Sequence, residues 1–392
     1  MRAIHQIIVI VLIAVPFFFF LDISVHAQTS EPEWTSDQWS AISFTEIQQY
    51  WTKVVEDYGG YLPELQKGSF AEFMKNHDAV SIQGWVGGLL KFFFYELVMN
   101  GKLLGTLVFL TLFSMILQSL QNAFEQQAVS KVAYAIVYMV LIMLALNSFY
   151  LAVSYAKDAI EMMSSFMVAL LPLMLGLMAT FGNVMAVSFF HPVILFLIHS
   201  SGVLISTIIL PLLFLSALLS IVSSINEEYK VTQLAQLLRN GAMGILGAFL
   251  TIFLGVISVQ GATTAITDGV AMKTTKFVTG NFVPVVGRMF TDATDTVLSA
   301  SLLLKNTVGI VGVVLILALA LFPAIKVLAI ALIYKIAAAV LQPVGGAPII
   351  SSMDIIAKHI LFIFAALLVV TFMFFLTIVL LVVTSNVTMM IR

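Results

Sequence analysis

The chain has 392 residues, of which 61% are apolar and only 10% are charged, a composition too apolar for a water-soluble domain. A formal net charge of −2 argues against a nucleic-acid partner, and the lack of cysteine excludes disulfides, thiolate metal sites and cysteine nucleophiles. Between Glu161 and Glu227 no residue is charged, an interval longer than three membrane crossings of about 20 residues each. The expected fold is therefore all-α, a polytopic α-helical membrane protein.

Residues 1–27 have the pattern of a secretory signal peptide. Arg2 precedes an apolar run from Ile7 to Leu21, and Ala27 ends a short cleavage site. The run covers about 15 residues, which is short for a membrane-spanning helix, although an uncleaved N-terminal anchor is the alternative. Either interpretation places residues 28–100 outside the cytoplasm.

Residues 28–100 form an acidic extracytoplasmic segment. They carry ten of the 20 acidic residues and all 4 tryptophans. Ile47, Trp51 and Val54 recur at helical spacing shortly before Gly59. We expect short amphipathic helices whose apolar face docks a partner, lies at the membrane interface or packs back on the protein's own helices.

Residues 101–392 are predicted to form one multi-span membrane domain. Its eight apolar stretches are Leu103–Leu120, Val132–Val153, Met162–Phe181, Val184–His199, Val203–Ser224, Ala242–Val259, Val308–Tyr334 and Ile360–Thr384. The division near Gly202 is weak, and Pro192 and Pro211 can kink a helix without ending it. The expected number of spans is therefore about 7–8.

Eight crossings would return Arg392 to the side on which residue 28 lies. The predicted inner side then carries Lys131, Lys230, Arg239, Lys335 and Lys358. The predicted outer side carries Lys273, Lys276, Arg288 and Lys305. The positive-inside rule thus supports this topology poorly.

A candidate contact helix for the inner face follows the fifth stretch. Glu227, Glu228 and Lys230 open it, and Arg239 and Gly241 close it. Its apolar stripe consists of Val231, Leu234, Leu237 and Leu238. A helix of this kind can contact a cytosolic motor, and it can equally be a plain connector between spans.

The polar segment 260–306 lies between two spans on the predicted outer side. Within it, Arg288 and Asp292 are i and i+4 on a helix, and Asp295 lies one turn further along the same side. Paired carboxylates suggest acid-base catalysis or a cation site, but no activated nucleophile or metal shell accompanies them. We interpret this face as a candidate pathway or contact surface, with an amphipathic interfacial helix as the alternative.

The stretch 341–350 contains a predicted helix break. Pro343, Gly345, Gly346 and Pro348 follow one another within ten uncharged residues, and helix cannot continue through them unbroken. Irregular backbone at membrane depth survives against protein or beside a water-filled cavity. These residues are a second candidate pathway, and an interfacial turn is the alternative.

No enzymatic function is expected. The sequence contains no phosphate-binding loop, nucleophile elbow or H-E-x-x-H motif, so neither catalytic nor cofactor-binding residues are assigned. His191 and His199 lie near one helix face, but no acidic residue accompanies them, and metal sites usually need three or four ligands. We therefore assign no metal site.

Several strings resemble a known family over essentially the whole chain. They include EDYGGYLPELQKGS from Glu56, NGKLLGTL from Asn100, SKVAYAIVYMVLI from Ser130, FFHPVILFL from Phe189, and further on EEYKVTQLAQLLRN, KFVTGNFVPVVGRMFTDATDTV and FPAIKVLAIALIYKIAAAVLQPVGG. Together they are similar to the stage III sporulation protein AE family of endospore-forming bacteria.

This resemblance implies a permease-like component of the sporulation channel complex that links the mother cell to the forespore. Family members lie in the outer forespore membrane on the mother-cell side and support late forespore gene expression. The implied partners are the other proteins of the complex, including a separate ATPase, and membrane lipid. A second copy of the same chain, in a homo-oligomer, is a further candidate partner.

Three functions are weighed. The leading one is a pore or permease component. The second is a non-conducting structural anchor that assembles the partner proteins. The third is a stand-alone ion-coupled secondary transporter, for which Asp292 and Asp295 would be the first coupling candidates.

Overall fold

The structure is a computed structural model. It describes the backbone of residues 44–62, 65, 70–75, 81–123, 127–180, 184–225, 230–282, 286–344 and 347–390. The predicted signal peptide, residues 1–27, lies outside the described residues.

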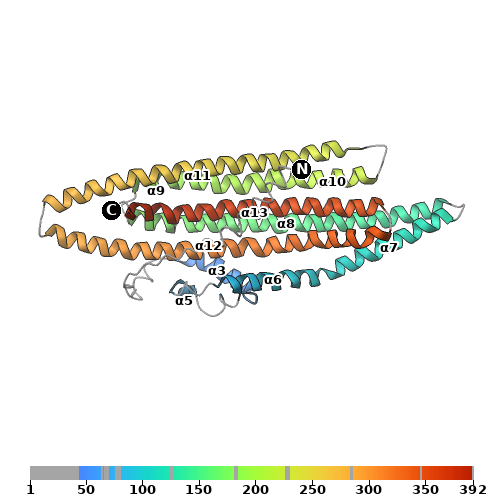
Figure 1. Ribbon diagram of the computed structural model, residues 1–392, viewed down its shortest axis with the longest axis horizontal. Coiled ribbons are helices and arrows are strands. Elements are labelled where there is room, and N and C mark those ends of the chain that lie inside the picture. The colour runs from blue at the N-terminus through green and yellow to red at the C-terminus, as the bar shows by residue number, and fades with distance from the viewer. Residues whose placement is uncertain are drawn as a thin grey trace.

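The described residues form long helices that run alternately up and down side by side (Figure 1). Among them, six helices are long and apolar enough to cross a membrane. The rods are α7 (Gly101–Ala123), α8 (Gln127–Thr180), α9 (Val184–Val203) continued by η2 (Leu204–Ile209) and α10 (Leu210–Ile225), α11 (Thr232–Phe282), α12 (Val286–Leu341) and α13 (Ala347–Met390). The all-α polytopic membrane fold is confirmed.

The eight predicted stretches occupy six rods. Helix α8 contains Val132–Val153 and all of the predicted stretch Met162–Phe181 up to Thr180, because the charged residues between them do not end it. Lys157 and Glu161 pair across one turn, with Nζ and Oε1 3.6 Å apart, an arrangement that fits a continuous helix. The π-helix η2 likewise joins α9 to α10.

Helix α11 also runs on where a break was expected. The short contact helix predicted before Gly241 is instead the first part of α11. A glycine inside a helix costs only about 1 kcal/mol relative to alanine, and Ala242, Met243 and Leu246 are buried directly after it. Leu234 and Leu237 of the predicted apolar stripe are exposed, while Ala235 is the buried residue.

Helix α12 is the central rod and packs most extensively on α13. Gly309 permits the close approach, because a Cβ on it would lie 2.2 Å from Val382 Cγ2 of α13. A Cβ on Gly312 would lie 2.9 Å from Leu170 Cδ2 of α8. Small residues take this place in membrane helices because van der Waals contact, rather than the hydrophobic effect, holds the helices together. We call the contact between α12 and α13 around Gly309 and Val382 the α12–α13 seam.

Hydroxyl groups add hydrogen bonds between rods. Tyr138 of α8 lies 2.9 Å from the Ser352 hydroxyl of α13, which is also 2.9 Å from that of Ser224 in α10. The Tyr334 hydroxyl of α12 donates to Ser148 Oγ of α8 at 2.9 Å. Each bond satisfies polar groups that lipid cannot, so the register of four rods is fixed.

Three helices precede the bundle. They are α3 (Thr45–Tyr58), α5 (Phe70–Lys75) and α6 (Ile82–Met99). Ile47, Trp51 and Val54 of α3 are buried, and α3 packs against α8 and α12. The amphipathic helix is confirmed, and of the three expected dockings the structure has the one on the protein's own helices.

The turn after α3 brings α6 close. Helix α3 ends at Tyr58, directly before Gly59, as the glycine predicts. A Cβ on Gly88 of α6 would lie 2.0 Å from the carbonyl oxygen of Tyr61. Only glycine permits this approach of helix to backbone.

Candidate functional site

A charged cavity of about 160 Å³ lies where α3 meets α8 and α12. Its walls are Lys53, Val54, Asp57 and Tyr58 from α3, Tyr155, Asp158, Ala159 and Met162 from α8, and Leu319, Pro323 and Lys326 from α12. We call it the α3 cavity. It combines two lysines, two aspartates and two tyrosines in a protein that has few charges.

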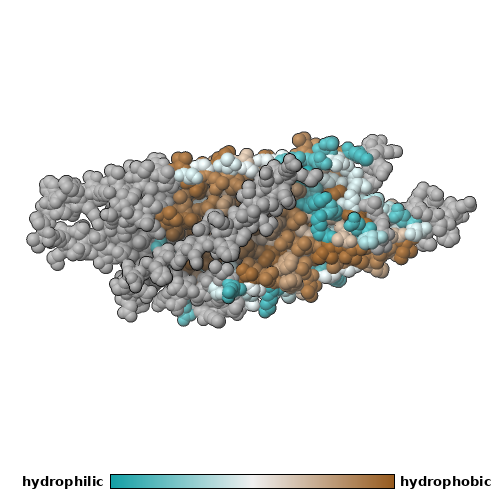
Figure 2. Space-filling view, viewed as in Figure 1, coloured by the Kyte–Doolittle hydropathy of each residue, from teal (hydrophilic) through white to brown (hydrophobic). Residues whose placement is uncertain are grey.

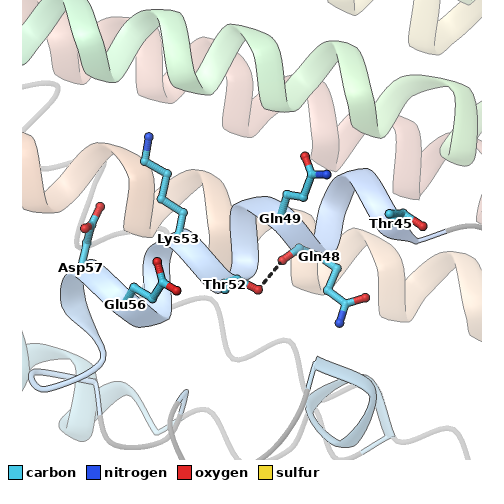
Figure 3. A pocket seen from close by; sticks show the side chains of 7 residues that line it. All are labelled: Thr45, Gln48, Gln49, Thr52, Lys53, Glu56 and Asp57. Atoms are coloured by element: carbon cyan, nitrogen blue, oxygen red, sulfur yellow. Dashed lines mark hydrogen bonds between the residues drawn. The ribbon is translucent and has the colours of Figure 1, made fainter.

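The amphipathic pattern of α3 explains its contribution. With Ile47, Trp51 and Val54 buried, the polar residues of the helix must lie on its other sides. Figure 3 shows Lys53 and Asp57 leaving α3 toward the neighbouring rods, whereas Gln48 points away and accepts a hydrogen bond at its carbonyl from Thr52 at 2.9 Å. An open groove of about 550 Å³ follows this solvent side of α3.

Lys326 is the cation that α12 brings to the cavity. Its Nζ lies 5.3 Å from the centre of the Tyr155 ring, within range of a cation–π attraction. Glu96 of α6 interacts electrostatically with Lys326. Burial raises the pKa of the Glu96 carboxyl above its ordinary value, although the Lys326 ammonium and a hydrogen bond from Asn100 act in the opposite direction. Asn100 Nδ2 donates to Glu96 Oε2 at 3.3 Å.

Tyr58 fixes the end of α3 against α12. Its ring stacks on Phe322 with centroids 4.1 Å apart and planes 1° from parallel, and it meets Phe92 edge-on at 5.9 Å. Burial, followed by the charges of Asp57 and Glu96, raises the pKa of the Tyr58 phenol to about 12. The phenol therefore stays neutral and keeps its proton for donation.

Pro323 lies next to Phe322 inside α12. Because proline has no N–H, the carbonyl of Leu319, four residues earlier, loses its helical hydrogen bond. Leu319 and Pro323 both line the α3 cavity. A carbonyl freed in this way needs another partner, which can be a water molecule that donates a hydrogen bond or a cation that the oxygen coordinates.

Several ionisable residues of the α3 cavity fall inside apolar candidate membrane spans, which is an unusual position for them. Tyr155 and Asp158 fall within the candidate span Val132–Ala179, and Lys326 falls within Asn306–Leu341. Ionisable residues in membrane helices are costly and usually face a bundle interior or a water-filled cavity that has a function. The arrangement can hold water, ions or a small polar solute, and it contains no nucleophile–base pair.

The predicted pathway residues lie at opposite ends of α12. Arg288, Asp292 and Asp295 belong to its first turns, so the predicted helix is confirmed, but their side chains lie outside the described residues. At the other end, α12 stops at Leu341 as expected, and the exposed Pro343 lies in the 3-10 turn η3 (Gln342–Val344).

The rest of the predicted break joins two rods. Pro348 is exposed in the first turn of α13, and Gly345 and Gly346 lie outside the described residues. The structure therefore does not bring the two candidate pathways together, because a helix of 56 residues separates them. Their functional roles stay predictions.

Of the predicted inner-face residues, the structure describes Lys230 and Arg239. Glu227 and Glu228 are outside the described residues, Lys230 is exposed before α11, and the Arg239 guanidinium lies 5.4 Å from the centre of the Phe362 ring. His191 and His199 are both exposed on α9.

Sequence reasoning missed the α3 cavity and an ion cluster around Asp354. Lys335 and Lys358 both pair with the Asp354 carboxylate. Isolated charges inside apolar stretches, Lys326 above all, are the signal that could have found these sites. Among the described residues, no group of three or more His, Asp or Glu side chains could hold a metal ion.

Comparison with known proteins identifies the family. A family model described as Stage III sporulation protein AE matches residues 65–385. Stage III sporulation protein AE of Bacillus subtilis (strain 168) is 57% identical over 367 residues, which cover 94% of this chain and 92% of the relative. No solved structure matches the chain. Matches that extend over both the bundle and the helices before it leave one conclusion, that this chain belongs to the stage III sporulation protein AE family.

Proposed function

We propose that the chain is a permease-like, non-enzymatic component of the channel complex that links mother cell and forespore, and that it supports late forespore gene expression from the outer forespore membrane on the mother-cell side. Its family membership supports the role in sporulation. The observation that carries the permease-like role is the α3 cavity, where Asp158 and Lys326 lie within candidate membrane spans. Other proteins of the complex, including a separate ATPase, are the proposed partners.

The chemistry of the α3 cavity suits small hydrophilic solutes. Lys53 and Lys326 offer cations, and Asp57 and Asp158 offer anions. A lining with both signs hydrates ions and polar solutes without trapping one charge. Lys53 and Asp57 of α3 line both this cavity and the open groove shown in Figure 3.

Neutralising the cavity tests this proposal. Lys326→Gln and Asp158→Asn should each lower a late forespore reporter while the amount of protein and its recovery with the complex stay unchanged. Lys91→Gln changes an exposed lysine of α6 away from the cavity and serves as the control. Reporter activity equal to wild type in both cavity variants would contradict the proposal.

Water access can be measured separately. The chain has no cysteine, so each introduced cysteine is the one reactive thiol. A small hydrophilic maleimide should label Asp158→Cys and spare Ala156→Cys, which replaces a fully buried residue one half-turn away. Equal, slow labelling of both would show that the cavity is closed to water.

The packing of α12 favours a second candidate function, the structural anchor. Phe322 and Tyr334 of α12 and Phe374 of α13 are fully buried, so a path along the centre of one chain would have to displace the central rod. An anchor predicts that harmful substitutions reduce recovery of the complex, whereas cavity variants leave the reporter unaffected.

A further inference from the structure

A cluster of cations gathers at the end of the bundle where α12 gives way to α13. Lys335 of α12 pairs with Asp354 Oδ1, and Lys358 of α13 lies with its Nζ 2.5 Å from Asp354 Oδ2. The side chains of Lys335, Asp354 and Lys358 are 39%, 32% and 56% exposed. Each ammonium donates one of its three N–H groups to the carboxylate, so two N–H groups are left for other acceptors.

Helix α11 adds a third cation. The Arg239 guanidinium lies over the ring of Phe362, 5.4 Å from its centre, and Phe362 is one helical turn beyond Lys358. With Arg239 the cluster holds three cations and one carboxylate, an excess of two positive charges. Hydrophilic residues are visible at this end of the molecule in the surface view (Figure 2).

The cluster lies where phospholipid headgroups are expected. Arg239, Lys335 and Lys358 belong to the candidate spans Thr232–Gln260, Asn306–Leu341 and Pro348–Val383, and each lies within about 15 Å of a helix end. Long cationic side chains at this depth extend toward the membrane–water interface.

Apolar surface accompanies the charges. Ile336 and Val340 follow Lys335 along α12 and are 40% and 57% exposed. Free phosphate or an acidic peptide would leave this surface in water. An anionic phospholipid matches both parts, because its phosphate meets the cations and its acyl chains cover the aliphatic side chains.

We propose that Arg239, Lys335 and Lys358 form a binding site for the phosphate of an anionic phospholipid. The lipid joins α11, α12 and α13 at one end of the bundle, since each helix supplies one cation. Asp354 holds the two lysines apart at fixed positions.

The test uses the full chain purified in detergent, titrated with short-chain phosphatidylglycerol, phosphatidylcholine or inorganic phosphate while thermal unfolding is followed. Phosphatidylglycerol should raise the unfolding temperature in a saturable, salt-sensitive manner, and the other two should not. The double variant Arg239→Gln/Lys358→Gln should bind about thirtyfold more weakly, about fivefold per cation.

The control variant is Lys91→Gln/Lys102→Gln, which removes two exposed lysines elsewhere and should keep wild-type affinity. Should the double variant not fold, Arg239→Gln alone should still weaken binding about fivefold. Equal stabilisation by phosphatidylcholine, reproduction of the effect by phosphate, or unchanged affinity in the cation variants would each overturn the proposal.

Discussion

Helix α12 has two unlike sides. Toward α13 it presents the α12–α13 seam, in which a Cβ on Gly309 would lie 2.2 Å from Val382 Cγ2. Toward α3 it presents Pro323 and Lys326 beside a charged cavity. The comparison teaches that the same helix is closely packed on one side and borders a charged cavity on the other, so we expect displacement of α3 to change the cavity side first.

The largest expected effect is on the docking of α3. Trp51 is 4% exposed and packs on Phe73 with ring centroids 4.5 Å apart. Trp51→Ala should weaken docking of α3 by about 3–5 kcal/mol without unfolding the rods. Labelling of Val54→Cys should become faster in the Trp51→Ala background, and Trp51→Phe is the control. Unchanged labelling would show that α3 is held by other contacts.

Overpacking the α12–α13 seam comes next. Gly309→Leu should destabilise the bundle by about 3 kcal/mol, because its side chain would overlap Val382. Gly105→Leu is the matched control, since a Cβ at Gly105 meets nothing within 4 Å. In detergent, Gly309→Leu should unfold at a lower temperature than Gly105→Leu. Equal midpoints would mean that the α12–α13 seam adjusts to the larger side chain.

A smaller effect of opposite sign is expected at the proline. Pro323→Ala restores an N–H that can bond to the Leu319 carbonyl, so stability should rise by about 1 kcal/mol. If the α3 cavity is the working surface, the late forespore reporter should fall at the same time. A gain in stability with unchanged reporter activity would show that function does not need Pro323.

The smallest effect concerns the charge on Glu96. Since burial raises the pKa of this carboxyl in the folded protein, its ionisation costs stability as the pH rises through that pKa. Glu96→Gln should therefore unfold at a higher temperature than wild type near neutral pH, and the difference should shrink as the pH falls toward 4.5, the ordinary value.

The control for this pH dependence is Glu56→Gln, which removes an exposed carboxylate of α3. It should shift the midpoint little at either pH. A lower midpoint for Glu96→Gln at neutral pH would mean that attraction to Lys326 outweighs the cost of burial.

The helices that the sequence predicts well are those with a local signal. Ile47, Trp51 and Val54 repeat at helical spacing, and Gly59 follows, so both the face and the end of α3 are evident. Whether a helix continues past a polar residue or a glycine depends on the contacts that form in the folded protein. Lys157 and Glu161 pair on the surface, and Gly241 is followed by residues buried against other rods, so neither site ends its helix.

The candidate site was less predictable because it joins distant positions. Lys53, Asp158 and Lys326 belong to three helices, and their proximity depends on which rods are neighbours. A single sequence gives the period of each helix but not its partners. Asp354 and Lys358 are i and i+4, yet the contribution of Lys335 follows only from the antiparallel pairing of α12 with α13.

The length of the rods has a mechanical consequence. Helix α8 has 54 residues and α12 has 56, about 80 Å each, whereas the hydrocarbon core is about 30 Å thick. Such rods can tilt about the turns that lie in the bilayer, so that their distant ends move the most. A tilt of about 10° would move a tip that extends about 50 Å from the bilayer by about 9 Å, enough to turn a small adjustment among lipid-embedded turns into a large displacement at a partner protein.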